Sequence, residues 1–380
     1  MVLHIAKRGD HNIGSKMHLQ ALIDLYGEDY VFIIDLLRKE PEKRKNYVAF
    51  GKYKNYFDRI NRFFERNVVY INNKIIKEIC KIIDENNIEM VFMEESDLGN
   101  LTKEIKTTFP EVKVVCFYHD ISADLFAQRR KHASWMKPHY KFLECNITIW
   151  QERINQKYCD ENWAFHQCDA ERFRHYYGYT PNVLIPLSAP VPAISDAAKR
   201  MVTSVDANKH ILFVCSEYYV NIRGFRWFYD HVLPKLEFNF HMTIIGTGST
   251  LLLDFCKDVR ISIKGSVDSV KKYYEQADIV IAPVFDGGGM KVKILEAFSF
   301  AKCLVSTSES LNGYWEALPD TLKNDIVHKC DTVEEWVSAL NKLVKSNVKK
   351  YNEDLFDVFK RNFSYEVMLA AFRKQLYKNI

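Results

Sequence analysis

The strongest constraint on the fold of this 380-residue chain is a regular alternation of short apolar runs with longer amphipathic segments. Residues 72–86 place apolar side chains on one face of a helix, with a period of about 3.6 residues. Such alternation is typical of α/β folds built on largely parallel sheets. In the first half of the chain, strands are predicted at residues 3–7, 30–35, 88–94, 112–118, 147–150, 162–166 and 182–186.

A segment without periodicity interrupts this pattern. Residues 186–201 contain three prolines and several small residues, which is typical of a linker. The chain therefore predicts two α/β domains of comparable size, over residues 1–190 and 209–355, joined by a linker over 191–208. After the break, strands are predicted at residues 210–216, 241–248, 259–265, 277–284 and 302–307.

Composition places the chain among ordinary globular proteins, with 47% hydrophobic and 27% charged residues. A net charge of +4 does not indicate a nucleic-acid partner. The nine cysteines form no C-x-x-C pair, and neither a signal peptide nor a membrane-spanning run is visible, so a cytoplasmic location is expected. The basic runs at residues 38–45 and 129–137 are expected to be solvated loops or helix faces. The second also carries Trp135 and Met136, which leaves open peripheral contact with the inner face of a membrane.

Three consecutive glycines, 287–289, stand before a predicted helix at residues 290–301 and after a predicted strand. Ligands bind at the carboxyl ends of strands in open α/β sheets, and glycines let backbone N–H groups approach an anion. Lys291 and Lys293 add charge there, and Lys293 and Glu296 share one helical face. A cation for phosphate beside a carboxylate for vicinal hydroxyls indicates a bound nucleotide. The alternative is a glycine loop with an ordinary surface Lys–Glu pair.

Two loops of the first half also follow predicted strands. The first, GDHNIGSKMH (9–18), contains Gly14, and the second, FYHDIS (117–122), contains His119 and Asp120. A plain turn and a structural histidine are the alternatives. Two doubly wound domains that face each other would bring such loops to a cleft.

Several catalytic and cofactor motifs are absent from the sequence. It has no phosphate-binding G-x-x-x-x-G-K-[ST], no G-x-G-x-x-G after the first strand, no H-E-x-x-H, no G-x-S-x-G and no Cys/His zinc pattern. Because D-x-D is also absent, no metal site is predicted for a nucleotide diphosphate. Protein cations and helix N–H groups would then have to stabilise a departing diphosphate.

From residue 210 onward the chain resembles the nucleotide-sugar-dependent glycosyltransferases of the GT-B fold, in particular the GT4-like, retaining group of glycosyl transferases group 1. The resemblance is carried by residues 210–236, 241–249 and 261–313, where A-D-x-x-x-x-P, the glycine loop and K-x-L-E-A are the specific elements. It implies two Rossmann-like domains that face each other across a cleft, with the acceptor on residues 1–190 and the donor on 209–355. FSYEVMLAAF resembles the closing helix, so residues 356–380 are expected to pack back on the first domain.

The resemblance also implies roles for residues of the glycine loop and the following helix. Glu296 matches the glutamate that holds the ribose hydroxyls. Gly288, Gly289 and Met290 fall where backbone amides meet the sugar and phosphates of the donor. Lys293 matches a lysine of the K-x-L-E-A variant.

The resemblance also implies roles for four residues outside that loop. Lys264 and Gly265 fall where a loop frames the nucleotide base. Gly14 matches the N-terminal glycine loop beside the diphosphate, and His119 matches the histidine that approaches the donor sugar.

Two departures from the family pattern concern charge. The earlier of two glutamates, eight positions apart, is replaced by Gly288, and Asp286 is the nearest carboxylate. The usual Gly-Arg is replaced by Cys215-Ser216, so that Arg223 alone keeps the expected basic residue. We hypothesise that Lys291 supplies the missing cation.

The resemblance implies a glycosyltransferase that needs neither metal nor cofactor, with His119, Arg223 and Lys293 as catalytic residues. The donor would be a UDP- or GDP-sugar, and the acceptor a glycan or lipid-linked saccharide of surface polysaccharide synthesis. The alternatives are a sugar-nucleotide epimerase of similar fold and a non-catalytic member that binds a nucleotide or glycan. An NAD-linked oxidoreductase is less favoured because the first strand lacks the dinucleotide glycine pattern.

Overall fold

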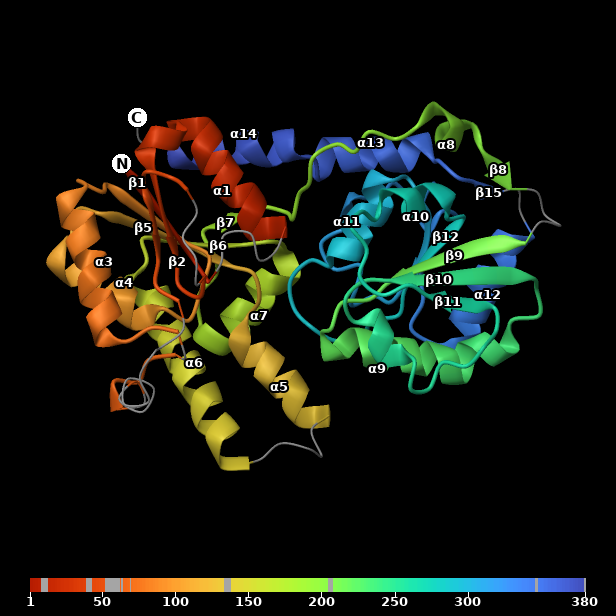
Figure 1. The fold of residues 1–380 in the computed structure, drawn as a ribbon, viewed down its shortest axis with the longest axis horizontal. Helices are drawn as coiled ribbons and strands as arrows, with labels where there is room; N and C mark the ends of the chain where they lie inside the picture. The colour runs from red at the N-terminus through yellow and green to blue at the C-terminus, as the bar shows by residue number, and fades with distance from the viewer. Residues whose placement is uncertain are drawn as a thin grey trace. The chain divides into compact units, whose positions relative to one another are not determined.

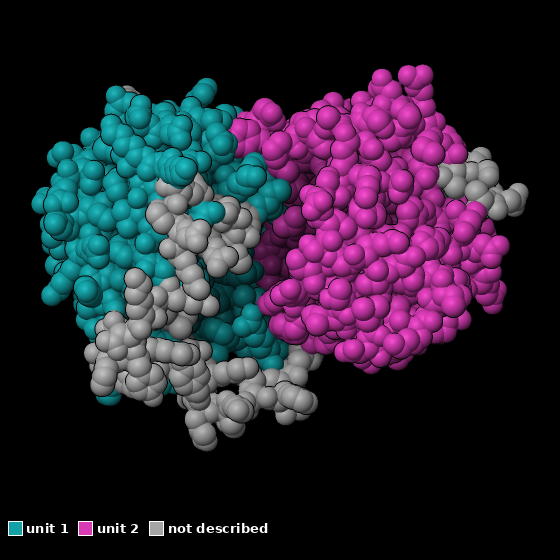
Figure 2. Space-filling model, viewed as in Figure 1, with its two compact units in different colours: residues 1–188, 368–380 teal, residues 189–367 magenta. Residues whose placement is uncertain are grey.

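The computed structural model describes residues 1–7, 13–38, 43–51, 62, 64–68, 70–132, 138–203, 208–345 and 348–378. The chain forms two compact units, coloured separately in Figure 2. Unit 1 comprises Met1–Ser188 and Met368–Ile380, and unit 2 comprises Ala189–Val367. The chain therefore passes between units after Ser188 and after Val367, whereas the sequence suggested boundaries at 190 and 356.

Unit 1 contains a seven-stranded sheet in the order β3-β2-β1-β4-β5-β6-β7, in which all neighbours are parallel (Figure 1). The strand order reverses between β1 and β4, which creates a topological switch point. The strands are β1 (Val2–Ala6), β2 (Val31–Asp35), β3 (Tyr47–Ala49), β4 (Met90–Met93), β5 (Lys113–Tyr118), β6 (Glu161–Ala164) and β7 (Val183–Leu184).

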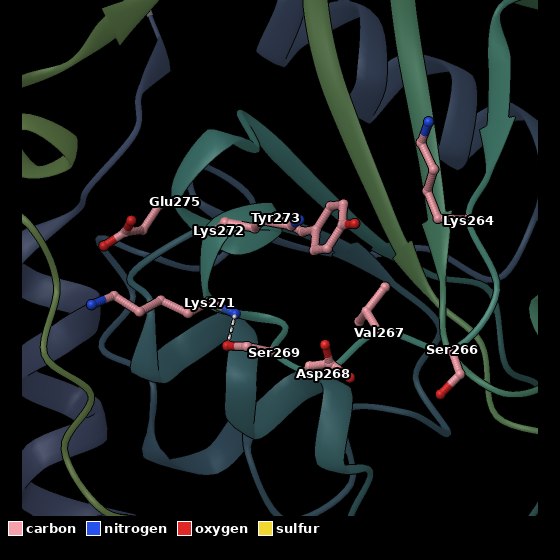
Figure 3. Close-up of a pocket in the computed structure, with 9 residues that line it drawn as sticks. All are labelled: Lys264, Ser266, Val267, Asp268, Ser269, Lys271, Lys272, Tyr273 and Glu275. Carbon is pink, nitrogen blue, oxygen red and sulfur yellow. Dashed lines mark hydrogen bonds between the residues drawn. The ribbon is translucent and has the colours of Figure 1, made fainter.

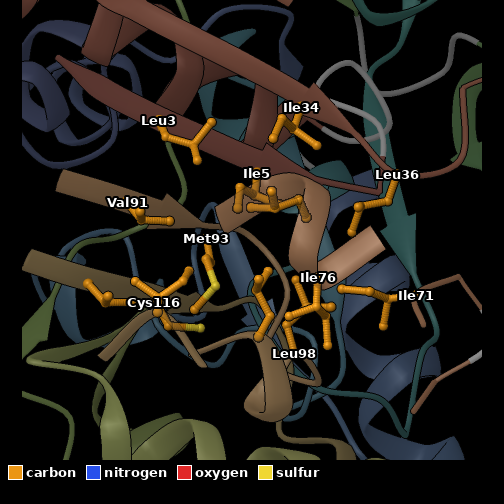
Figure 4. Packing of buried hydrophobic residues seen from close by; sticks show 14 of the residues in the cluster. Leu3, Ile5, Ile34, Leu36, Ile71, Ile76, Val91, Met93, Leu98 and Cys116 are labelled. Carbon is orange, nitrogen blue, oxygen red and sulfur yellow. The ribbon is translucent and has the colours of Figure 1, made fainter. Parts of the chain in front are cut away.

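One face of this sheet carries the apolar core shown in Figure 4. Successive side chains of a strand point to opposite faces of the sheet, so every second strand residue faces this core. Ile5, Met93 and Cys116 are examples. They pack against Ile76 of α3 and Leu101 of α4. The helices with described bounds in this unit are α1 (Ile13–Tyr26), η1 (Glu28–Tyr30), α3 (Asn73–Glu85), α4 (Gly99–Thr108), α5 (Ser122–His132), α6 (Pro138–Tyr158), α7 (Gln167–Tyr177) and most of α14 (Tyr365–Leu376).

The other face of the sheet is aromatic and is covered by α1 and α14. Phe372 of α14 lies with its ring centroid 5.2 Å from that of Trp163, 5.6 Å from Phe92 and 5.3 Å from His18 of α1. Near the end of the chain, the Tyr377 hydroxyl donates to the carbonyl of Leu25 at 2.9 Å. The closing helix is thus an integral part of the core of unit 1.

Unit 2 repeats the same topology in a six-stranded parallel sheet with the order β11-β10-β9-β12-β13-β14. Its switch point lies between β9 and β12. The strands are β9 (Lys209–Val214), β10 (Phe240–Ile245), β11 (Ile261–Ile263), β12 (Ile279–Ala282), β13 (Cys303–Ser306) and β14 (Val327–Lys329), and β8 (Val202–Thr203) pairs antiparallel with β15 (Val348–Lys349).

Helices of unit 2 bury Phe225, Phe228 and Trp336 against its sheet. They are α8 (Asp196–Arg200), α9 (Tyr219–Trp227), the π-helical turn η2 (Phe228–Val232), η3 (Leu233–Lys235), η4 (Ser249–Leu252), α10 (Lys271–Gln276), α11 (Val292–Ser299), η5 (Trp315–Ala317), α12 (Val333–Val344) and α13 (Glu353–Asn362).

The predicted α/β class is confirmed, and one predicted strand is wrong. Residues 147–150 lie within α6, although Ile-Thr-Ile-Trp is a strand-like run. Tertiary packing decides the conformation, since α6 lies so close to α4 that a Cβ built on Gly99 would be 2.2 Å from the carbonyl oxygen of Gln151. The short strands β3 and β14 were not predicted. Among the described residues, no helix combines the length and apolarity needed to span a membrane.

The packing of α14 yields a stability prediction. Replacing Phe372 by Ala should lower the free energy of unfolding of unit 1 by about 3 kcal/mol, because it empties a buried aromatic site. Urea unfolding, followed by tryptophan fluorescence, measures this change. Lys374→Ala, an exposed substitution in the same helix, should stay within about 0.5 kcal/mol. Equal effects of the two changes would contradict the packing.

Candidate functional site

The glycine loop joins β12 to α11 at the switch point of unit 2. Gly287 has a φ of 109° and Gly289 a φ of 58°. The first value is readily adopted only by glycine, so the loop conformation requires this residue. Helix α11 begins at Val292, which makes Lys291 its N-cap rather than a residue of its first turn. The start of the helix carries partial positive charge and backbone N–H groups without partners inside the helix.

Helix α9 packs directly against the backbone that follows β12. A Cβ built on Gly224 would lie only 1.6 Å from the carbonyl oxygen of Pro283, so no side chain fits between the two backbones. This approach brings Asn221 and Arg223 of α9 to the glycine loop and to α11.

Lys293 is a buried cation that α11 directs toward α9. Its ammonium donates to Oδ1 of Asn221, whose Nδ2 donates to Oγ of Ser216 at 2.7 Å. The same ammonium lies 4.7 Å from the ring centroid of Phe213. Burial lowers the pKa of Lys293 to about 8. The charged form of the lysine is therefore less favoured than in water, and an anion bound beside the ammonium would stabilise it.

Glu296 lies one turn further along α11 and faces α10. The Tyr274 hydroxyl donates to its Oε2 at 2.9 Å, and the Tyr274 ring stacks on Phe300 with centroids 5.0 Å apart. Burial raises the pKa of Glu296 to about 7, against the lowering effect of the tyrosine hydrogen bond. Additional hydroxyl donors would favour the carboxylate form.

Arg223 and Asp286 form an ion pair across the same switch point. The sequence offered Arg223 as the remaining basic residue of the β9–α9 region and Asp286 as the nearest carboxylate to Gly288. The structure shows that these two residues bind each other. An anion that contacts Arg223 must therefore share it with Asp286.

The side chain of Lys291 folds back over the glycine loop. Its ammonium donates to the carbonyl of Gly288 at 2.7 Å and lies 3.8 Å from Oε1 of Glu309. The Tyr314 hydroxyl donates to the carbonyl of Lys291 at 3.1 Å, which fixes the backbone at the helix start. The lysine thus places a charge at the loop, next to the position where the family pattern has a glutamate.

The other predicted donor-site residues of unit 2 differ from one another in their exposure to solvent. Met290 is buried, whereas Lys264 is exposed immediately after β11. Gly265 donates through its N–H to Oγ of Ser249 at 3.1 Å and accepts from the N–H of Gly246 at 2.8 Å. The Lys264–Gly265 turn is therefore anchored to the loop that follows β10.

An open hollow of about 650 Å³ lies beside Lys264 (Figure 3). Its lining includes Lys271 and Lys272 as well as Asp268 and Glu275, so its charge is mixed. Neither Lys293 nor Glu296 contributes to the lining. The hollow alone does not favour an anion, and the chemistry of unit 2 is concentrated at the glycine loop.

In unit 1, the predicted residues Gly14 and His119 come from neighbouring elements. Gly14 is buried in the first turn of α1, and the next residue, Ser15, has its Oγ 3.4 Å from Nε2 of His119. The same Nε2 lies 2.5 Å from Oε2 of Glu94, which follows β4. Both predicted residues therefore lie at the carboxyl ends of the strands of unit 1.

Glu94 is the centre of a buried cluster that the sequence analysis missed. Its carboxylate accepts from His4 Nε2 at 3.0 Å and from His18 Nδ1 at 3.1 Å, besides His119. Burial alone would raise the pKa of Glu94, but electrostatic interaction with His18 and the three imidazole hydrogen bonds hold it well below its usual range. Strand alternation could have revealed the cluster, because His4, Phe92 and Glu94 share one face of the sheet.

Carboxylate and imidazole groups of this kind could also hold a metal ion, and ligand atoms of His18, Glu94 and His119 lie within 4.8 Å of one another. The imidazole nitrogens are, however, 2.5–3.2 Å from the carboxylate oxygens. Two ligand atoms of a tetrahedral zinc ion would be about 3.3 Å apart. The spacing is that of a hydrogen-bond network.

Residues 208–346 match the family model described as glycosyl transferases group 1. The match confirms the predicted class of enzyme, a glycosyltransferase. A search of curated proteins found no match.

Solved structures similar to the whole chain show the GT-B fold, as predicted. Sucrose-phosphate synthase from Thermosynechococcus elongatus has a TM-score of 0.70 at 12% identity, covering 99% of this chain and 98% of the other. A trehalose-phosphate synthase from Burkholderia xenovorans gives 0.64 at 10% identity, with coverage of 99% and 100%. HepE of Anabaena, in complex with UDP and glucose, gives 0.65 at 11% identity, with coverage of 100% and 99%.

Within the region that matches the family model, most predicted residues lie around the start of α11. Lys293 and Arg223 meet there with Gly288 and Lys291, and Glu296 follows one turn later. Lys264 and Gly265 lie apart, after β11. The partners Asn221 and Tyr274 were not predicted as site residues, although both lie within the segments that carry the family resemblance.

The raised pKa of Glu296 predicts a stability effect that depends on pH. Between pH 4.5 and about 7 the folded protein binds more protons than the unfolded chain, so this residue makes stability fall as pH rises. Glu296→Gln should therefore increase the free energy of unfolding of unit 2 by about 2 kcal/mol at pH 8 and leave it nearly unchanged at pH 4.5.

Urea unfolding at the two pH values measures the difference. The exposed residue Glu316 provides a matched control, and Glu316→Gln should give no such dependence. A loss of stability for Glu296→Gln at pH 8 would show that the carboxylate is favourably paired in the folded protein.

Proposed function

We propose that this protein transfers a sugar from a nucleoside diphosphate sugar to a saccharide acceptor, with the donor bound at the start of α11. Lys293 and Glu296 carry the proposal. One helix presents a buried cation to the switch-point loop and, one turn later, a carboxyl group with a raised pKa. This combination suits a diphosphate next to a ribose, since phosphate favours the charged lysine and vicinal hydroxyls donate to a carboxylate.

The proposed catalysis is mainly positioning and electrostatic stabilisation. Lys293, Arg223 and the backbone N–H groups at the start of α11 stabilise the departing diphosphate, and Lys291 adds charge at the glycine loop. His119 contacts the donor sugar, as the resemblance implies. Transfer proceeds with retention of configuration, and neither a metal ion nor another cofactor takes part.

UDP is the first donor nucleotide to test, with GDP as the alternative. Structures of HepE from Anabaena hold UDP or UDP-glucose, and this likeness supports the choice. The acceptor proposed is a glycan or a lipid-linked saccharide of surface polysaccharide synthesis, bound by residues 1–190. A cytoplasmic protein with peripheral contact at the inner face of the membrane would suit such an acceptor. The basic run 129–137 lies largely outside the described residues.

Calorimetric titration with UDP, GDP, ADP, CMP and NAD in the presence of EDTA tests the donor site. One nucleoside diphosphate should bind selectively, and Lys293→Met should weaken it roughly 10- to 100-fold because a charge-assisted contact is lost. Lys302→Met provides the control, since Lys302 is another buried lysine of unit 2 with a pKa lowered to about 8. Binding that requires a divalent cation, or that ignores Lys293, would contradict the proposal.

The pH dependence of the same binding is a separate prediction. Affinity should rise as Glu296 ionises through about pH 7 and fall as Lys293 loses its proton above about pH 8. Glu296→Gln should remove the acid limb and Lys293→Met the alkaline limb. Ionisation of the nucleotide phosphate affects all variants alike, so comparison among them isolates the side chains.

Transfer itself is tested by incubating the protein and the selected sugar nucleotide with and without saccharide acceptors. Release of nucleoside diphosphate that depends on an acceptor supports the proposal. Conversion of the sugar nucleotide without an acceptor would instead indicate an epimerase.

A further inference from the structure

The buried cluster around Glu94 joins four elements of unit 1 at one carboxylate. His4 belongs to β1, His18 to α1, and His119 follows β5. Each imidazole directs one ring nitrogen at the carboxylate, at 2.5–3.2 Å. Glu94 itself has a side chain that is 0% exposed. A buried ionised carboxylate needs charged or hydrogen-bonded partners, and here imidazole N–H groups supply them.

The three histidines differ in their access to solvent. The side chains of His4 and His18 are 0% and 1% exposed, whereas that of His119 is 19% exposed. His119 therefore connects the buried carboxylate with the surface at the carboxyl ends of the strands. Because its Nε2 faces Glu94, its Nδ1 is the ring nitrogen left for a ligand.

Electrostatics supports a positive charge on His119. Burial lowers the pKa of His18, and that effect outweighs its interaction with Glu94. Burial also lowers the pKa of His119, but the hydrogen bond and charge of Glu94 outweigh it, so the pKa is raised. Of these two histidines, only His119 has surroundings that favour its protonated form over that of an ordinary imidazole.

The His18 ring, stacked 5.6 Å from that of His119, opposes a second positive charge. The other groups around His119 act in the same direction as Glu94 or are neutral. The carboxylates of Glu95 and Asp120 add to the raising effect. Glu95 itself forms an ion pair with Lys7, the residue after β1, and this pairing limits the effect of Glu95 on the pKa of His119. Ser15 of α1 lies 3.4 Å from Nε2, and the rings of Phe117 and Phe165 lie 5.2 Å and 5.3 Å from the imidazole.

We propose that Glu94 is a positioning residue, which holds His119 as an imidazolium with Nε2–H on the carboxylate and Nδ1–H available to an oxygen of the substrate. His119 then acts as a charged hydrogen-bond donor and cannot act as a base until it loses its proton. His4 and His18 saturate the rest of the carboxylate and fix its orientation. The catalytic consequence rests on the proposed function, whereas the charge state of His119 does not.

The charge state is tested by a pH titration of the histidine side chains by NMR, with ¹⁵N-labelled histidine in the full chain. His119→Gln identifies the signal, and the exposed His175 serves as an internal reference. We expect His119 to titrate above the ordinary value of about 6.5. In Glu94→Gln, which keeps the size and a hydrogen-bond acceptor, the titration midpoint of His119 should fall.

Glu94→Asp controls for misfolding, because it keeps the charge while shortening the side chain. Its His119 midpoint should lie closer to that of the unmodified protein than to that of Glu94→Gln. An unchanged His119 midpoint in Glu94→Gln, in a protein whose amide spectrum stays dispersed, would overturn the proposal. So would one equivalent of zinc or manganese retained after purification, measured by elemental analysis, and lost in Glu94→Gln.

Activity then tests the consequence separately. With the donor selected by calorimetry, Glu94→Gln should lower kcat at least tenfold with little change in KM, and should move the alkaline limb of kcat to lower pH. If the NMR shift appears but no sugar is transferred from any nucleoside diphosphate sugar, the proposed function fails and the role of Glu94 in setting the charge of His119 stands. If transfer occurs but His119 is unaffected by Glu94→Gln, only the positioning role fails.

Discussion

Both units depend on the reversal of strand order at the centre of a parallel sheet. Where the order reverses, the helices that follow the two central strands lie on opposite faces, and the loops between them border a crevice that helices do not fill. In unit 2 this crevice lies between β9 and β12, where Gly224 lets α9 touch the backbone of Pro283. In unit 1 it lies between β1 and β4, next to Glu94. The candidate residues of both units project from these positions.

Burial at the start of α11 pushes two ionisable groups toward their neutral forms. The pKa of Lys293 falls and that of Glu296 rises, so the folded protein without ligand holds both charges at an energetic cost. A ligand with negative charge near the lysine and hydroxyl donors near the carboxylate removes part of that cost. The same arrangement that destabilises the empty site therefore contributes to affinity, which is a common compromise in binding sites.

Much of the fold could be predicted from local patterns, and the failures have physical causes. The apolar runs of β9, β12 and β13 are continuous because both faces of these strands are buried, and that pattern does not depend on distant partners. Residues 147–150 are equally strand-like, but contacts of α6 with α4 made them helical. The glycine loop and Lys293–Glu296 were predictable from spacing within one segment. The Glu94 cluster was not found because its members are 14 to 115 residues apart in the sequence. The pairing of Arg223 with Asp286 depends on the approach of two backbones at Gly224.

The partners of the basic residues around α11 differ in charge. This difference decides how strongly each basic residue can attract an anionic ligand. Arg223 is bound to Asp286 and Lys291 lies near Glu309, so an incoming anion must compete with a carboxylate at both. Lys293 is bound to the amide of Asn221, which is neutral. Replacing an amide oxygen by a phosphate oxygen increases the attraction to the ammonium without leaving a carboxylate unpaired. Lys293 is therefore the cation on which anion binding in unit 2 should depend most strongly.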